Sequence, residues 1–227
     1  MKMLTYLPLS GVLLIASGLI ACSAPQMQSQ AASSSPQTES TSTPDVATPP
    51  TSPALVGWPA ILGPTSVPAG WRVEPCENPS QLCVYTNNEI VGTVELFSHP
   101  IAGSNFAPLL AEAKGERLPA LNAWVTEHYA TIERDRNLGA PEMKFMAEPP
   151  EEVAVGSLPG LRYSFNTNLA NGSVGDRTVG YVTTDGTSLY VVAMTAADGD
   201  HSGAFSSIEA AQTFEPYLAD IVAGLKL

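Results

Sequence analysis

Positive charge is scarce in this chain. Its 227 residues include 10 lysines and arginines against 22 aspartates and glutamates, which gives a formal net charge of −12. Proteins that bind nucleic acids need basic side chains to displace counterions from phosphates, so this composition argues against a nucleic-acid partner. Long apolar runs are missing beyond the N-terminus, which excludes a protein with several membrane-spanning helices.

Catalytic motifs are also missing. The sequence contains no Gly-x-Ser-x-Gly elbow, no glycine-rich phosphate loop and no His-Glu-x-x-His pair. Of only 3 histidines, His128 lies on a predicted apolar helix face, where we expect a histidine at the edge of the core. The sequence therefore predicts a protein that is not an enzyme and needs no cofactor. An exported hydrolase whose site is assembled by the fold is the least favoured alternative.

The N-terminus has the pattern of an export signal. Lys2 precedes an apolar run over residues 7–20, which is too short and too interrupted for a membrane span. Its end, Leu-Ile-Ala-Cys at residues 19–22, resembles the lipobox of bacterial lipoproteins. The resemblance implies a signal peptide over residues 1–21 and lipidation of Cys22, with anchoring to a bacterial membrane on its periplasmic or thylakoid-lumen side. The alternative is an ordinary signal peptide with Cys22 near the cleavage point by chance.

A tether and a single domain are expected after Cys22. Serine, threonine, proline and glutamine make up 23 of the 31 residues from 23 to 53. Such a segment buries too little apolar surface to offset its ordering entropy, so residues 22–53 are predicted to form a disordered tether. A mucin-like stalk is the alternative. Residues 54–227 suffice for one domain with its own hydrophobic core.

Cysteine usage agrees with export. If Cys22 is lipidated, Cys76 and Cys83 remain as an even pair on either side of a turn-rich stretch. In an oxidising compartment this spacing favours a disulfide. A metal or redox pair is the alternative, but neither Cys-x-x-Cys nor a neighbouring histidine is present.

Apolar periodicity predicts an α+β domain. The strand pattern recurs with turn residues between the segments, among them Asn87-Asn88 as a tight hairpin turn, and the helix pattern appears twice. We expect strands at 71–74, 82–86, 89–97, 143–147, 152–156, 161–167, 177–184 and 188–195. Helices are expected at 118–136 and 214–225, with Thr213 as a possible cap and a further short helix capped by Ser206. Residues 98–117 are expected to form a loop before the first helix.

The predicted strand 189–194 is apolar at every position, which is typical of a strand covered on both faces. This pattern predicts an antiparallel sheet with helices on both sides. The order of elements, with Pro-Ala-Gly-Trp at 68–71 and Leu-Pro-Gly-Leu-Arg-Tyr-Ser-Phe at 158–165, resembles the fold shared by the extrinsic subunit P of photosystem II (PsbP) and a nuclear import factor that binds Ran. The resemblance implies an α/β/α sandwich and a non-catalytic binding or assembly subunit.

Two sites remain as candidates. Asp198, Asp200 and His201 gather possible metal ligands in one loop, although turns and helix caps are rich in the same residues. Trp58, just after the tether, either docks on the domain's own core or inserts into a partner. We therefore expect a lipid-anchored accessory or assembly subunit that binds a membrane protein complex. The alternative is a lipoprotein that binds a metal or a small ligand.

Overall fold

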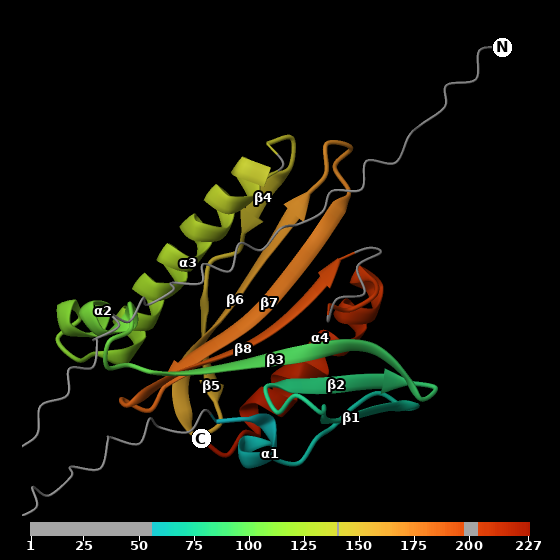
Figure 1. Ribbon diagram of the computed structural model, residues 1–227, viewed down its shortest axis with the longest axis horizontal. Coiled ribbons are helices and arrows are strands. Elements are labelled where there is room, and N and C mark those ends of the chain that lie inside the picture. Colours follow the sequence, from blue (N-terminus) through green and yellow to red (C-terminus); the bar gives the residue numbers. More distant parts are fainter. Residues whose placement is uncertain (1–55, 140, 198–203) are drawn as a thin grey trace, which may run out of the picture. The chain divides into compact units, whose positions relative to one another are not determined.

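The computed structural model describes residues 56–139, 141–197 and 204–227. The predicted signal peptide, Cys22, the tether and the loop with Asp198, Asp200 and His201 lie outside the described residues. The described chain forms one antiparallel sheet of eight strands in the order β1-β2-β3-β8-β7-β6-β4, and β5 also pairs with β6 (Figure 1). The strands are β1 Trp71–Pro75, β2 Gln81–Thr86, β3 Glu89–Pro100, β4 Lys144–Ala147, β5 Glu151–Val155, β6 Leu158–Asn168, β7 Val174–Thr184 and β8 Ser188–Ala197.

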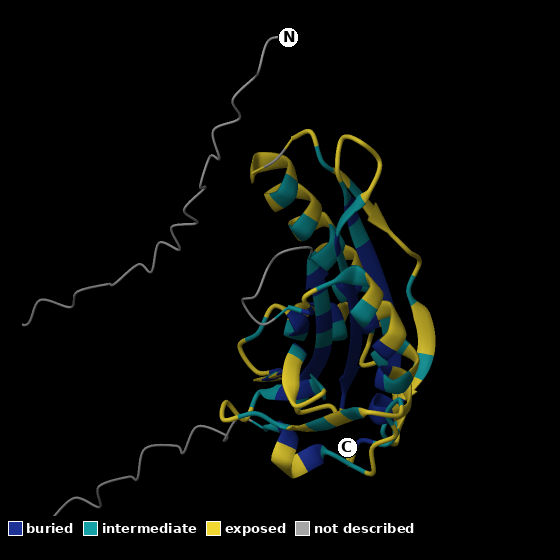
Figure 2. Cartoon of the chain, turned by 90° about the vertical axis from the view of Figure 1, so that its right-hand side faces the viewer, coloured by how far each residue is buried: buried dark blue, intermediate teal, exposed yellow. Residues whose placement is uncertain are grey.

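Helices cover both faces of this sheet, as predicted. The helices are α1 Trp58–Ile61, α2 Phe106–Glu112, α3 Arg117–Gly139 and α4 Ile208–Ala223. One apolar core lies between α4 and the sheet, and a second lies between the α2–α3 pair and the opposite face. Figure 2 shows the buried residues along the strands, with exposed residues on the outer sides of the helices. The expected α/β/α arrangement is confirmed.

The terminal helix α4 is held by charge as well as by its apolar stripe. The carboxylate of Glu215 accepts hydrogen bonds from Arg162 of β6 and Arg177 of β7, with 3.2 Å between Arg177 Nη2 and Glu215 Oε2. All three side chains are less than one-fifth exposed. Such pairs strengthen when they are partly withdrawn from water, so Glu215 fixes α4 on β6 and β7.

Tight turns account for the register of the hairpins. Asn87 and Asn88 both have positive φ, at 51° and 65°, which is the conformation of the two-residue turns that suit the twist of paired strands. This predicted turn between β2 and β3 is confirmed. A bulge at Val84 and Tyr85 then shifts the register of the same hairpin by one residue.

Asp185 closes the β7–β8 turn. Its carboxylate accepts hydrogen bonds from the backbone N–H groups of Thr187 and Ser188, at 2.7 and 2.8 Å, and from the hydroxyl of Tyr190. Desolvation raises the pKa of Asp185, but the hydrogen bonds from Ser188, Thr187 and Tyr190 outweigh it and hold the pKa at about 2. The charged form of Asp185 is therefore part of the folded turn.

Two expectations about the helices were wrong. The C-terminal part forms one helix, α4, rather than two. Its N-cap is Ser207 and not Ser206, since the Ser207 hydroxyl accepts a hydrogen bond from the backbone N–H of Ala210. Thr213 caps no helix; it lies inside α4, where its hydroxyl donates to the Glu209 carbonyl. Pro216 lies inside α4 rather than in the first turn of a helix, and it does not end the helix because α4 packs on the sheet.

The expected loop at 98–117 was also wrong in part, since it contains α2. Pro108 lies in the first turn of this helix, where a missing backbone N–H costs nothing. Phe106 and Leu109 are buried against α3 and fix the short helix there. Tertiary packing therefore decides the structure of a segment whose local sequence favours a loop.

Candidate functional site: a groove between α3 and the sheet

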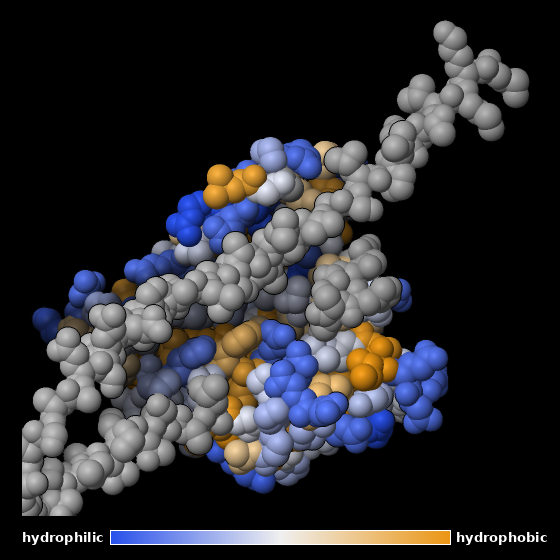
Figure 3. Space-filling model, viewed as in Figure 1, coloured by the Kyte–Doolittle hydropathy of each residue, from blue (hydrophilic) through white to orange (hydrophobic). Residues whose placement is uncertain are grey.

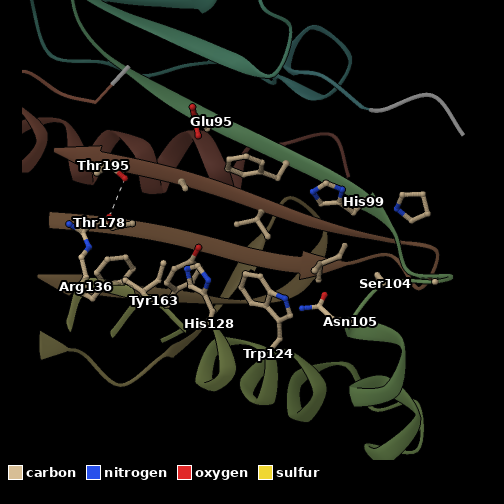
Figure 4. A pocket seen from close by; sticks show the side chains of 18 of the residues that line it. Glu95, His99, Ser104, Asn105, Trp124, His128, Arg136, Tyr163, Thr178 and Thr195 are labelled. Atoms are coloured by element: carbon tan, nitrogen blue, oxygen red, sulfur yellow. Dashed lines mark hydrogen bonds between the residues drawn. The ribbon is translucent and has the colours of Figure 1, made fainter. Parts of the chain in front are cut away.

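Helix α3 covers only part of its face of the sheet. It packs on β4, β6 and β7, so the adjoining surface of β8 and β3 is left to line an open groove with a volume of about 750 Å³. Figure 4 shows α3 on one side of this groove and β3 on the other. Figure 3 shows apolar atoms gathered between the α3 side and the β1–β3 side of the molecule. We call this space the α3 groove.

Strand alternation determines which side chains face the groove. In β3, Glu95, Phe97 and His99 point into it, while the residues between them face away. On the neighbouring strand β8, Ala193, Val191 and Leu189 stand directly opposite these three and complete the floor. The antiparallel register therefore places one charged, one aromatic and one imidazole side chain along the same rim.

The opposite wall comes from one stripe of α3. Trp124, His128 and Ile132 follow each other at a spacing of four residues, so they lie on one helix face. The rings of Trp124 and His128 stack with 5.1 Å between their centroids, and Tyr163 meets both edge-on. Desolvation lowers the pKa of His128, so its imidazole is neutral at pH 7. The wall is thus aromatic and uncharged, and His128 lies at the edge of the core.

The ring of Tyr163 ends one row of residues across the floor. Along one row of the sheet, Glu95 stands opposite Ala193, Ala193 opposite Gly180, and Gly180 opposite Tyr163. A Cβ at Gly180 would lie 2.2 Å from Cζ of Tyr163, so only glycine lets the tyrosine ring lie across β7. Burial raises the pKa of Tyr163, and its phenol therefore stays neutral.

Charge in the groove is unevenly compensated. Arg136 of α3 donates to Asp176 Oδ2 of β7 at 2.5 Å, and the Asp176 side chain is only 9% exposed. Glu95 forms no ion pair with any described residue; its Oε1 accepts a long hydrogen bond, 3.4 Å, from the Gln81 amide. Glu95 is therefore the one charged side chain lining the described groove that lacks a described counter-ion.

The site residues expected from the sequence lie elsewhere. The disulfide between Cys76 and Cys83 is confirmed, with 5.2 Å between the Cα atoms, and it joins the end of β1 to β2. Trp58 is completely buried and its indole Nε1 donates to the Val94 carbonyl at 3.1 Å. It packs in the domain's own core, so the alternative that Trp58 inserts into a partner is wrong for this structure: its one polar atom is already satisfied inside.

The sequence patterns considered above did not predict the α3 groove. One signal was available, because the sequence Glu-Leu-Phe-Ser-His at 95–99 alternates and must put Glu95, Phe97 and His99 on one face. A buried sheet face seldom carries a glutamate, so this alternation marked an open part of the face. Within residues 56–139, 141–197 and 204–227, no group of three or more histidine, cysteine or acidic side chains could hold a metal ion.

Comparisons with known proteins give similarity in structure only. No protein-family model and no curated protein matches the sequence. The fold is similar to the solution structure of cyanobacterial PsbP (CyanoP) from Synechocystis sp. PCC 6803, at 10% identity and a TM-score of 0.43, covering 72% of this chain and 85% of that one. A structure from Bacteroides thetaiotaomicron matches at 10% identity and a TM-score of 0.31, covering 71% and 43%. The first belongs to the family that the sequence resemblance named.

None of the helices in the described part of the chain has the length and apolar composition of a membrane span.

Proposed function

We propose that this protein is an exported, lipid-anchored binding protein without a catalytic centre, and that the α3 groove binds its ligand. The observation that carries the proposal is the groove. Its volume of about 750 Å³ lies in the range typical of ligand sites, roughly 300–1,000 Å³, and its lining is mainly apolar and aromatic with a few polar groups. This combination favours a ligand with an apolar body.

The groove offers binding contacts rather than a reactive group. Among the described residues, neither His99 nor His128 is hydrogen-bonded to a serine, cysteine or carboxylate side chain, the arrangement that activates a nucleophile. His128 is instead stacked on Trp124. The hydroxyls of Thr178 and Thr195, which also line the groove, are hydrogen-bonded to each other, with 3.1 Å between the two Oγ1 atoms.

The anchor in this proposal rests on the lipobox at 19–22. Without Lys2 the chain from Cys22 onward carries 9 basic and 22 acidic residues, a net charge of −13. An anionic membrane surface repels such a chain, so the lipid has to provide the attachment. We expect Cys22→Ser to move the protein from the membrane fraction to the soluble fraction and to abolish incorporation of labelled palmitate. Unchanged membrane association of this variant would contradict the anchor.

A groove-filling substitution tests the binding site. Ala193 lies half-buried on the floor, so Ala193→Trp should fill the groove without disturbing a closed core. Ala154→Trp is the matched control, because Ala154 is an exposed strand alanine that does not line the groove. Both are made in the mature chain carrying Cys22→Ser, so that no acyl chain competes for the groove.

The readout is the fluorescence of 1-N-phenylnaphthylamine, an uncharged apolar probe. We expect saturable binding by the parent chain and by Ala154→Trp, and at least a tenfold weaker affinity for Ala193→Trp. Equal unfolding midpoints of the two variants exclude a folding defect. Absence of saturable binding by the parent chain, or equal affinity of the two variants, would refute the groove as the binding site.

A second candidate is the accessory subunit of a membrane protein complex. It is favoured by an apolar tip formed by Leu138, Met146 and Leu169, which are 79%, 47% and 37% exposed. They come from the end of α3, from β4 and from the β6–β7 connection, which lie together at the top of Figure 1. Large exposed apolar side chains at one end of a domain are a feature of protein interaction surfaces.

Charged substitutions separate this candidate from the first. Leu138→Glu, Met146→Glu and Leu169→Glu are combined in one lipidated chain, with Ala193→Trp as the comparison. Each chain is used to capture a membrane complex from solubilised membranes. If the triple glutamate variant loses this capture and Ala193→Trp keeps it, the accessory role is supported. If neither variant loses the capture, the apolar tip is not the surface that binds the complex.

A further inference from the structure

The charges of the α3 groove do not balance. Glu95 and Arg136 are its two fully charged side chains, and Asp176 neutralises Arg136 at 2.5 Å. The carboxylate of Glu95 keeps only the neutral amide of Gln81 as a partner among the described residues. The groove therefore carries a net negative charge, on the side of β3, in a chain with a net charge of −12.

Space is available next to this carboxylate. The floor beside Glu95 consists of the small side chain of Ala193, and the ring of Tyr163, which lies over Gly180, closes the row. Figure 4 shows Glu95 at the β3 rim and Tyr163 below β7, on opposite sides of the groove. A ligand group that lies over Ala193 therefore has the carboxylate on one side and a neutral phenol on the other.

The surroundings of this space are aromatic. Phe97 follows Glu95 on the same face of β3 and is 42% exposed, while Trp124 and His128 form the facing wall. The faces of aromatic rings attract cations, and a carboxylate adds a direct ion pair. A carboxylate without a counter-ion among aromatic rings is suited to an ammonium group, whereas an anionic ligand would meet the charge of Glu95.

We propose that the α3 groove is specific for an organic cation, an amine on an apolar or aromatic body, with its ammonium group at Glu95. This inference rests on the proposed function, since it names the ligand class of the same groove. The apolar body packs against Val191, Phe97 and Trp124, and the charge selects among ligands of equal size.

Three probes of matched shape test the charge. Dansylcadaverine is cationic, its N-acetyl derivative is neutral, and a dansyl amino acid of similar length is anionic. Each is titrated by fluorescence into the mature chain with Cys22→Ser. We expect the cationic probe to bind at least tenfold more tightly than the neutral one, equivalent to about 1.4 kcal/mol, and the anionic probe to bind most weakly.

Glu95→Gln removes the charge and retains the shape. Its expected effect is at least a tenfold loss of affinity for the cationic probe and less than a twofold change for the neutral probe. Glu89→Gln is the matched control, since Glu89 is an exposed glutamate of the same strand outside the groove, and it should change neither affinity. Glu95→Asp keeps the charge and should preserve the cationic preference.

The outcomes distinguish the two levels of the proposal. If the parent chain binds no probe, the groove is not a ligand site and the proposed function fails with it. If the parent chain binds the neutral and cationic probes equally, or if Glu95→Gln weakens both to the same extent, the groove binds ligands but the preference for a cation is refuted.

Discussion

Replacing Gly180 with alanine should destabilise the domain, although alanine ordinarily improves a strand. Glycine inside a strand costs roughly 0.5–1 kcal/mol relative to alanine, so a substitution in open space would stabilise. At Gly180 the new Cβ would meet Cζ, Oη and Cε1 of Tyr163 at 2.2, 2.5 and 2.6 Å. Favourable contacts between carbon atoms lie at about 3.5–4.0 Å, so the ring has to move by more than 1 Å.

Neighbouring rings hold Tyr163 in place against that movement. It is 2% exposed and makes ring contacts with Trp124, His128 and Tyr129. Overpacking of this kind costs about 1–3 kcal/mol, which exceeds the gain in backbone entropy. We therefore expect Gly180→Ala to lower the free energy of unfolding by about 1–2 kcal/mol, measured by urea denaturation monitored by circular dichroism.

Gly175→Ala is the matched control in the same strand. The Cβ there would approach Cδ2 of Leu169 at 2.9 Å, the end of a flexible and partly exposed side chain, so we expect a change of less than about 0.5 kcal/mol. In a chain that carries Tyr163→Ala, Gly180→Ala should cost nothing, because the obstructing ring is gone. Equal stability of Gly180→Ala and the parent chain, or an unchanged penalty in the Tyr163→Ala chain, would refute this account of the groove floor.

Three further changes follow from contacts described above. Replacing both Cys76 and Cys83 with serine opens an eight-residue loop and should cost about 2.5 kcal/mol of unfolding free energy, a difference that disappears when both chains are measured under reducing conditions. The pKa of Asp185 is depressed to about 2, so its charged form stabilises the fold at neutral pH, and this stabilisation is lost as the pH falls from about 4 to 2. We therefore expect the parent chain to have a higher unfolding free energy than Asp185→Asn at pH 7. The difference between the two chains should shrink between about pH 4 and pH 2. Glu215→Gln leaves the two arginines of β6 and β7 partly buried without their carboxylate and should lower the unfolding free energy by about 2 kcal/mol, whereas the exposed Asp220→Asn should change it little.

Local patterns were enough for the strands and most turns. Alternation placed β3, β6 and β7 within a few residues, and Asn87-Asn88 specified a turn because both residues tolerate positive φ. The fully apolar strand at 189–194 correctly required helices on both faces. The disulfide followed from the two cysteines that remain once Cys22 is assigned to the lipobox, and from the short loop between them. Each of these inferences needs only neighbouring residues.

Patterns failed where distant contacts outweigh local preference. Segment 106–112 is helical because Phe106 and Leu109 find a partner surface on α3, and no local signal reveals that surface. Pro216 stays inside α4 because the helix is held on the sheet by its apolar stripe and by Glu215. Burial of Trp58 was one of two open choices until the Val94 carbonyl was seen to accept its indole N–H.

The sequence by itself determined the strands, the helical stripe of α3, the disulfide and the acidic charge of the chain, because each depends on residue type and short spacing. Only the tertiary structure decided that α3 stops short of β8 and β3, and that Glu95, Ala193, Gly180 and Tyr163 form one row across four strands. These residues are up to 98 positions apart in the sequence. Their meeting depends on the register of three strand pairs, and a shift of one residue in any pair would turn the row to the opposite face.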